Sequence, residues 1–465
     1  MTQGVISLKT LLKGGTVVSG SGTRKADVLL EDEKITNVGR SLECTGAQVV
    51  DVTGMFLFPG FIDAHTHFDL DVAGTTTADN FETGSRAAVR GGTTTVIDFA
   101  CPNKGETLAH GLELWHQKAD GKTFCDYGFH MTIDDWNEGI ENELPDMFAA
   151  GITSFKMYMT YPAMMIGDRD MYAALKKIKA LGGICGFHCE NAGVIDALIA
   201  ERRAAGKLGP SSHPMTRPDY LEAEAVGRLM RIAQAAACPV IVVHLTNEAA
   251  LKEVEAARKR GQKIYVETCP HYLLLDESVY YQPEYSAAAR YICAPPLRST
   301  ADQKRLWRAL RREEIQTIST DHCSFTLEQK EMGREDFTKI PGGLPGVETR
   351  GELIWSYGVA TRRISAPQMA RLLSENPARL YGLYPKKGAI RKGSDADIVV
   401  YDPKASHVIR AEDCVANVDY NPYEGFVTDG GIHQVWLRGT LMTEQGKFLA
   451  DAPEGKYIAR GKNSL

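Results

Sequence analysis

Ile152-Thr-Ser-Phe-Lys-Met-Tyr-Met159 is an apolar stretch with a lysine, Lys156, near its centre. Its length and its content of aromatic and branched residues predict a buried strand. A lysine ammonium is rarely buried without a partner, and it is a poor metal ligand. A lysine that has combined with CO2 is instead a carbamate, whose two anionic oxygens can bridge two metal ions. The strands around this stretch should then supply the remaining ligands.

Seven similar apolar stretches lie on both sides of Lys156, and patterns typical of amphipathic helices lie between several of them, as in 171–181 and 248–260. Apolar strands that alternate with helices predict a parallel sheet covered on both faces. Eight such units within residues 59–388 favour a TIM-like (β/α)8 barrel in the α/β class. The eight predicted strands are 61–65, 93–99, 126–130, 153–158, 184–188, 240–244, 264–268 and 317–321.

The two ends of the chain have a different character. Residues 1–58 contain short strand patterns punctuated by Gly and Asp, and the same pattern returns in residues 389–465. We therefore expect one smaller β-sandwich domain built from both ends, followed by a C-terminal tail.

Composition excludes several classes of function. The chain has 465 residues, a formal net charge of −6 and a pI near 6.1, which argues against nucleic-acid and anionic-membrane partners. No apolar run reaches the roughly 18–20 residues that span a bilayer, and residues 1–10 lack the apolar core of a signal peptide. Ten scattered cysteines fit a reducing compartment, so we expect a cytoplasmic protein. Cys185 and Cys189 flank a histidine, but we interpret them as buried core residues.

Ligand-type residues lie at or near the ends of five predicted strands, where barrels of this kind carry their chemistry. His65 and His67 are two residues apart, so both can point to the same face of a strand. The predicted metal ligands are His65, His67, Lys156, His188, His244 and Asp321. The other eight histidines we expect to be structural or at the surface: His110, His116, His130, His213, His271, His322, His407 and His433.

This ligand set predicts a pair of divalent ions about 3.5–4 Å apart. Zinc suits histidine and oxygen ligands best, with manganese or cobalt as alternatives. A metal-bound water is acidified towards a pKa of about 7 and can attack a carbonyl carbon. Asp321 is placed to take its proton and pass it to a leaving nitrogen. Tyr161, five residues beyond Lys156, is the candidate donor to the developing oxyanion.

Ten short motifs together resemble the cyclic amidohydrolases of the dihydropyrimidinase and hydantoinase group, over nearly the whole chain. They are Gly60-Phe-Ile-Asp-Ala-His-Thr-His67, Gly91-Gly-Thr-Thr-Thr, Ser154-Phe-Lys-Met-Tyr158, His188-Cys-Glu-Asn191, His244-Leu-Thr-Asn247, Glu267-Thr-Cys-Pro-His-Tyr-Leu273, Pro295-Pro-Leu-Arg298, Thr320-Asp-His322, Gly343-Leu-Pro-Gly-Val-Glu348 and Gly393-Ser-Asp-Ala-Asp397.

The resemblance implies roles for individual residues. His65, His67, N6-carboxylated Lys156 and Asp321 would hold one zinc, and the same lysine with His188 and His244 the other. Tyr161 would bind the substrate carbonyl. The implied protein is a cytoplasmic homotetramer that opens the ring of a small cyclic amide. The substrate would be a 5-substituted hydantoin, which gives an N-carbamoyl amino acid, or dihydrouracil or dihydrothymine.

Two positions depart from the family pattern, and both belong to loops expected to contact the substrate ring through their backbones. Ala294 stands where the family has Ser, and Gly342 stands where it has Asn. Ring selectivity is therefore open. The apolar loop 157–166 is either a gate for a bulky 5-substituent, which favours hydantoins, or packing at the barrel rim.

Three other functions are compatible with part of this sequence pattern. A dihydroorotase is disfavoured because Phe68-Asp69, and no arginine, follow the His-x-His pair. A non-catalytic scaffold relative is disfavoured because all six ligands are present. A urease-like role is compatible with the ligand set alone, and only Tyr161 and the Pro-Pro-Leu-Arg motif favour cyclic amides.

Overall fold

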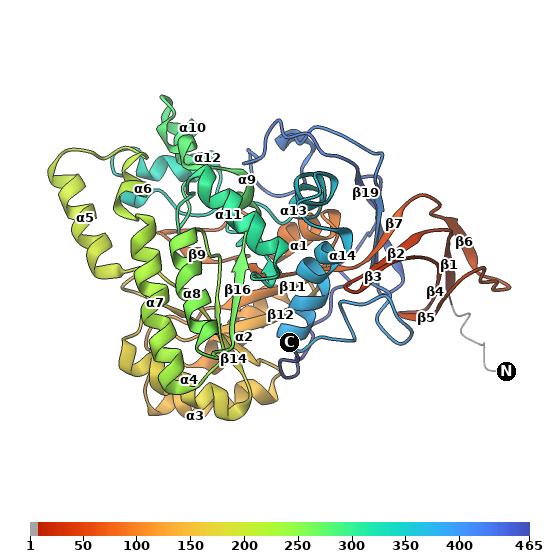
Figure 1. Ribbon diagram of the computed structural model, residues 1–465, viewed down its shortest axis with the longest axis horizontal. Helices are drawn as coiled ribbons and strands as arrows, with labels where there is room; N and C mark the ends of the chain where they lie inside the picture. Colours follow the sequence, from red (N-terminus) through yellow and green to blue (C-terminus); the bar gives the residue numbers. More distant parts are fainter. Residues whose placement is uncertain (1–7) are drawn as a thin grey trace.

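Eight parallel strands form the sheet at the centre of the computed structural model, which describes residues 8–465 (Figure 1). Each strand pairs with the next along the chain, and an isolated parallel bridge between Thr66 and His322 connects the last strand end to the first. The predicted (β/α)8 barrel is confirmed. Its strands are β8 (Phe61–Thr66), β11 (Thr93–Ala100), β12 (Asp126–Thr132), β13 (Ser154–Tyr158), β14 (Ile184–His188), β15 (Val240–Val242), β16 (Ile264–Thr268) and β17 (Thr317–Ile318).

Two strands are shorter than predicted. β15 ends at Val242 and β17 at Ile318, whereas the apolar pattern suggested strands up to His244 and Asp321. Both of these residues have positive φ angles, 38° and 50°, which an extended strand cannot contain. The predicted strands were therefore wrong at their carboxyl ends, where the chain turns to present side chains.

Helices cover the outside of the barrel (Figure 1), and asparagine caps help to start them. The side chain of Asn191 accepts a hydrogen bond from the Val194 amide, and that of Asn247 accepts one from the Ala250 amide. The two caps close the His188-Cys-Glu-Asn and His244-Leu-Thr-Asn motifs, so each motif turns a strand end into a helix start. The long helices are α1 (Phe81–Arg90), α2 (Leu108–Ala119), α3 (Glu138–Ala149), α4 (Asp168–Leu181), α5 (Ala192–Ala204), α7 (Asp219–Ala236), α8 (Glu248–Lys259) and α11 (Thr300–Arg311).

Short helical segments fill the loops at the barrel rim and the stretch that follows β17. They are α6 (Ser212–Thr216), α9 (Pro270–Leu274), α10 (Tyr285–Ala289), α12 (Leu327–Lys330), α13 (Arg350–Ile354), α14 (Ala366–Ala370) and α15 (Asn376–Leu380). A two-stranded hairpin, β9 (Asp71–Val72) and β10 (Thr75–Thr76), follows the first barrel strand.

Two additional sheets come from the chain ends and lie at the right of Figure 1. One sheet has the order β5-β4-β1-β6, from Lys34–Gly39, Asp27–Glu31, Lys9–Lys13 and Gln48–Asp51. The other has the order β21-β20-β19-β18-β7-β2-β3, from Lys447–Phe448, Thr440–Glu444, Gly431–Leu437, Ile398–Asp402, Phe56–Pro59, Thr16–Ser19 and Gly22–Lys25. In the second sheet β18 pairs with β7, which joins the C-terminal part of the chain to the N-terminal part.

A shared apolar core lies between these sheets and includes Leu12, Val28, Leu57, Ile398, Val400 and Trp436. The expected β-sandwich built from both chain ends is therefore present. We propose residues 1–58 and 389–465 as the two parts of the sandwich and residues 59–388 as the barrel. Residues 1–7, part of the segment on which the signal-peptide prediction rests, lie outside the described residues.

Buried charges join the sandwich to the barrel. The Lys387 ammonium lies 2.5 Å from a carboxylate oxygen of Asp126, which begins β12, and 2.6 Å from one of Asp397. The C-terminal segment also returns to the barrel, where the guanidinium of Arg460 donates a 2.6 Å hydrogen bond to the hydroxyl of Ser154. Ser154 begins β13, the strand that carries Lys156.

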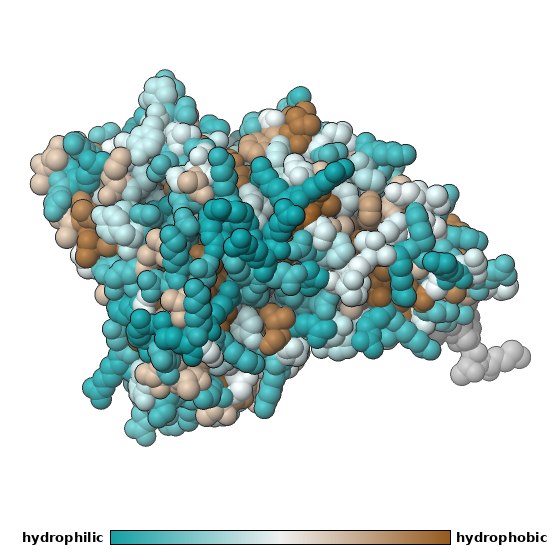
Figure 2. Space-filling view, in the orientation of Figure 1, coloured by the Kyte–Doolittle hydropathy of each residue, from teal (hydrophilic) through white to brown (hydrophobic). Residues whose placement is uncertain are grey.

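No helix within residues 8–465 is long and apolar enough to cross a membrane. Figure 2 shows one face of the molecule as mostly hydrophilic, with the hydrophobic residues in small separate groups. The large apolar side chains are instead concentrated in the barrel and sandwich cores.

Candidate active site

The six predicted ligands meet at the carboxyl-terminal ends of the barrel strands, where they line one cavity of about 400 Å³. This volume lies within the range typical of small-molecule sites. His65 belongs to β8 and His67 follows it, Lys156 is in the middle of β13, and His188 ends β14. His244 and Asp321 follow β15 and β17.

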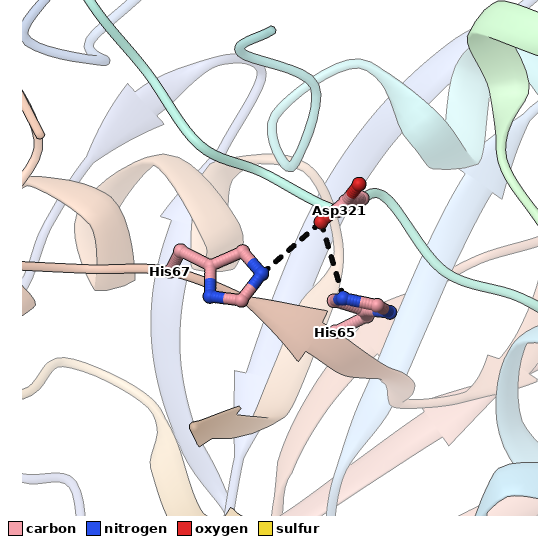
Figure 3. Close-up of side chains that lie close together, drawn as sticks. All are labelled: His65, His67 and Asp321. Atoms are coloured by element: carbon pink, nitrogen blue, oxygen red, sulfur yellow. Dashed lines mark ion pairs between the residues drawn. The ribbon is translucent and has the colours of Figure 1, made fainter. Parts of the chain in front are cut away.

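His65, His67 and Asp321 form a close group (Figure 3). An oxygen of the Asp321 carboxylate lies 3.1 Å from Nε2 of His65 and 3.1 Å from Nε2 of His67. One potential ligand atom from each residue lies within 4.8 Å of the others, a spacing at which they could hold a metal ion. The i, i+2 spacing of the two histidines therefore brings both rings to the same carboxylate.

His188 and His244 continue this cluster along the cavity. The ring centroids of His65 and His244 are 5.5 Å apart, and those of His244 and His188 are 4.6 Å apart. All three rings are buried. The four imidazoles thus form a continuous row across the strand ends.

Lys156 is 1% exposed, and burial lowers the pKa of its amine. Its Nζ lies 5.1 Å from the centre of the Phe99 ring, which stacks on His67 at 4.9 Å. Within residues 8–465 this amine has no hydrogen bond and no ion pair. A buried lysine without an ion pair is unusual. A lowered pKa favours the neutral amine, which is the form of lysine that can react with CO2.

Two glutamates orient the histidine rings. Nδ1 of His65 donates to Glu267 at 2.6 Å, which leaves Nε2 directed at Asp321. Nε2 of His188 lies 2.7 Å from Glu190, whose carboxylate also pairs with Arg217 at 2.6 Å. Carboxylates in this position fix the tautomer and direction of a metal-binding imidazole. Both glutamates stand in motifs noted in the sequence, but no local pattern predicted a role for either of them.

The charge states in the cavity suit a cation. Burial alone would raise the pKa of Asp321, but His65 and His67 lower it well below the usual range. Burial lowers the pKa of His67 to about 4 and that of His244 well below its usual range. The ionised carboxylate and the neutral imidazoles of His67 and His244 are in the protonation states that metal binding requires. Asp321 and Glu267 raise the pKa of His65 to about 9 although burial opposes this, so a bound cation would displace a proton from His65.

Two nitrogens in the cluster are buried and unpartnered. Nδ1 of His67 and Nδ1 of His244 have no hydrogen bond within the described part of the chain, whereas Nε2 of His65 lies 3.1 Å from the Asp321 carboxylate. Buried polar atoms are rarely left unpaired, so each needs an explanation. Bound metal ions account for free nitrogens next to an ionised carboxylate, and the residues present therefore fit such a centre.

Tyr161 also lines the cavity, 5.2 Å from His188 between ring centroids, with the Arg217 guanidinium 5.4 Å from its ring. Within residues 8–465 its hydroxyl makes no hydrogen bond, so it is free for a ligand. Tyr161 has a φ of 68°, and the predicted ligands His244 and Asp321 are also in the left-handed region. Such strained conformations concentrate at functional sites.

Ala294 and Gly342 line the same cavity from two loops. Neither offers a polar side chain, and within the described residues neither backbone N nor O is hydrogen-bonded. A Cβ atom added at Gly342 would meet no atom within 4 Å, so packing at the Cβ position does not require a glycine here.

The apolar loop 157–166 divides between the two expected roles. Met157 and Met159 are buried in the barrel core, whereas Ala163 and Met164 line the cavity. Leu70, Val72 and Ile340 add further apolar wall. His213 and His271 line the cavity as well, although the sequence assigned them only structural or surface positions. Cys185 and Cys189 lie in the core, as expected.

Comparisons with known proteins agree with this geometry. Residues 56–442 match the model of the amidohydrolase family. The chain belongs to the amidohydrolase family. Membership implies a binuclear metal centre, in agreement with the cluster above.

Named relatives cover nearly the whole amidohydrolase chain. It is 42% identical to a D-hydantoinase of Geobacillus stearothermophilus over 455 residues, which are 97% of this chain and 96% of that protein. It is 39% identical to a D-phenylhydantoinase of Escherichia coli strain SE11 over 458 residues, 97% of this chain and 98% of that one. The crystal structure of a dihydropyrimidinase from Brevibacillus agri NCHU1002 superposes with a TM-score of 0.97 at 41% identity, covering 98% of this chain and all of that one.

Proposed function

We propose that this amidohydrolase opens the cyclic amide bond of 5-substituted hydantoins and releases N-carbamoyl amino acids. One observation carries the proposal: a metal-binding cluster, a free tyrosine hydroxyl and apolar side chains line the same cavity. Relatives of about 40% identity that are named D-hydantoinase and D-phenylhydantoinase support it.

The proposed centre holds two divalent ions. His65, His67 and Asp321 would bind one, His188 and His244 the other, and N6-carboxylated Lys156 would bridge them. Zinc suits these donors best, with manganese or cobalt as alternatives. When bound, such ions polarise the amide carbonyl and acidify an attacking water.

The side chains then have separate tasks. Asp321 accepts the proton of the attacking water and delivers it to the ring nitrogen that leaves, which balances the reaction. The Tyr161 hydroxyl donates to the carbonyl oxygen as negative charge develops on it. The free peptide groups of Ala294 and Gly342 bind the polar edge of the ring.

The apolar wall supports a substituted ring as the substrate. Met164, Leu70 and Ile340 offer contacts that an alkyl or aryl 5-substituent can use and that bare dihydrouracil cannot. A dihydropyrimidinase is the second candidate, because a structural neighbour carries that name. We further propose that the protein is a cytoplasmic homotetramer, as expected from the family.

Ring opening by zinc-loaded protein, with 5-phenylhydantoin and dihydrouracil measured side by side, tests the proposal. Faster turnover of 5-phenylhydantoin is the expected result. Faster turnover of dihydrouracil would assign a dihydropyrimidinase instead. No ring opening by protein with two bound metal ions per chain would overturn both assignments.

A further inference from the structure

Lys330 is a second buried lysine at this end of the barrel, separate from the metal cluster. It ends the short helix α12 and is 1% exposed. Its ammonium donates to three main-chain carbonyls, at 3.1 Å to Ile292, 2.6 Å to Pro341 and 2.9 Å to Gly343. No carboxylate pairs with it within residues 8–465. Burial without a counter-ion costs free energy and lowers the pKa of this amine to about 7, so the three carbonyls are what stabilises its charged form here.

The three carbonyls belong to the two loops that carry Ala294 and Gly342. These loops are also bound to each other, because the Gly343 amide donates to the Ile292 carbonyl at 2.9 Å. Three carbonyl oxygens that converge on one point repel one another unless a donor lies between them. The ammonium of Lys330 lies between them as that donor and bonds to both loops.

The distance between the loops matters because both loops line the cavity and carry free peptide groups. The N and O atoms of Ala294 and Gly342 make no hydrogen bond within the described residues, and both residues line the cavity. The polar edge of a cyclic amide needs donors and acceptors at fixed spacing. With no polar side chain at either position, that spacing depends on the backbone of both loops.

We propose that Lys330 is a positioning residue for recognition of the substrate ring. Its ammonium holds loops 292–294 and 341–343 at the separation at which their peptide groups bind the cyclic amide. This inference rests on the proposed function, because it takes a cyclic amide as the ligand.

The test compares Lys330→Met, which removes all three hydrogen bonds, with Lys330→Gln, which keeps neutral donors. Tyr285→Phe is the matched control, since the Tyr285 hydroxyl donates to the Lys330 carbonyl at 2.7 Å and leaves the ammonium contacts intact. KM and kcat for 5-phenylhydantoin and for dihydrouracil, together with metal content per chain, are measured for all four proteins.

Lys330→Met should raise KM for both rings about 10- to 100-fold, with kcat changed less than about threefold and full metal content. We expect KM to rise and kcat to stay nearly constant, because these peptide groups bind the ring equally well in the ground state and in the transition state. Lys330→Gln should lie between Met and wild type, and Tyr285→Phe should match wild type.

The two possible failures can be told apart. No ring opening by the wild type would overturn the proposed function and this inference with it. Wild-type turnover with an unchanged KM in Lys330→Met would overturn the role of Lys330 alone, as would an equal rise of KM in Tyr285→Phe. If Lys330→Met does not fold, an unchanged KM in Lys330→Gln overturns it.

Discussion

Replacing Tyr161 with phenylalanine isolates one hydroxyl in the active site. Within residues 8–465 this hydroxyl makes no hydrogen bond, so its removal leaves no partner unsatisfied. The ring would keep its contacts with Tyr158, at 6.2 Å between centroids, and with His188, at 5.2 Å. We therefore expect the free energy of unfolding to change by less than about 1 kcal/mol.

The effect on catalysis should be much larger. A donor aimed at a developing oxyanion contributes about 3–4 kcal/mol to the transition state, so kcat should fall about 10²- to 10³-fold. KM should change less, because the ground-state carbonyl carries less negative charge. The assay is the initial rate of 5-phenylhydantoin opening, with metal content and thermal unfolding measured on the same preparation.

Tyr158→Phe provides the comparison, since Tyr158 lines the same cavity from the preceding strand. The prediction requires that kcat fall in Tyr161→Phe and not in Tyr158→Phe. A kcat for Tyr161→Phe within threefold of wild type, at full metal content, would refute the assignment of the oxyanion donor.

Three further changes test the site and the fold. Lys156→Ala should abolish metal binding and activity, with partial recovery when a short carboxylic acid and metal are added; full activity without the acid would contradict a carbamate. Glu267→Gln should weaken metal affinity about 10- to 100-fold by loosening His65, as measured by chelator competition, and an unchanged affinity would count against that role. The carboxylate of Asp395 lies 3.0 Å from the Lys387 ammonium. This pairing lowers the pKa of Asp395 to about 2, although burial alone would raise it. A group with a depressed pKa stabilises the fold only while it is ionised. Above pH 4 the free energy of unfolding in urea should therefore be roughly 2 kcal/mol higher for wild type than for Asp395→Asn, and this difference should shrink towards pH 2. A difference that does not vary with pH would contradict this.

The sequence predicts the barrel and the metal cluster because both depend on local patterns. Each strand is a short apolar run, and each ligand lies at or near the end of one, so spacing along the chain is enough to place it. His65 and His67 show this most clearly, since the two-residue period of a strand brings both rings to Asp321.

Features that depend on distant contacts could not be predicted in the same way. Glu267 contacts His65 from a strand about 200 residues away in the sequence, and no local pattern around either residue predicts this contact. Lys330 lies in an ordinary polar segment, and only the folded loops reveal that three carbonyls surround its ammonium. The sequence identifies ligand types, whereas the partners that orient them come from the tertiary structure.

Backbone strain at the site is another feature that local sequence patterns do not predict. Tyr161, His244 and Asp321 all have positive φ angles, and each such residue costs about 1–3 kcal/mol unless its surroundings hold it in place. Asp321 is held on both sides: the Thr320 amide donates to Asp63 at 3.1 Å, and His322 pairs with Asp79 at 3.0 Å. These buried bonds fix the turn, so the carboxylate of Asp321 remains aimed at the two histidines. At His244 and Asp321 the positive φ angles accompany the early ends of β15 and β17, and the chain turns there so that both side chains line the cavity.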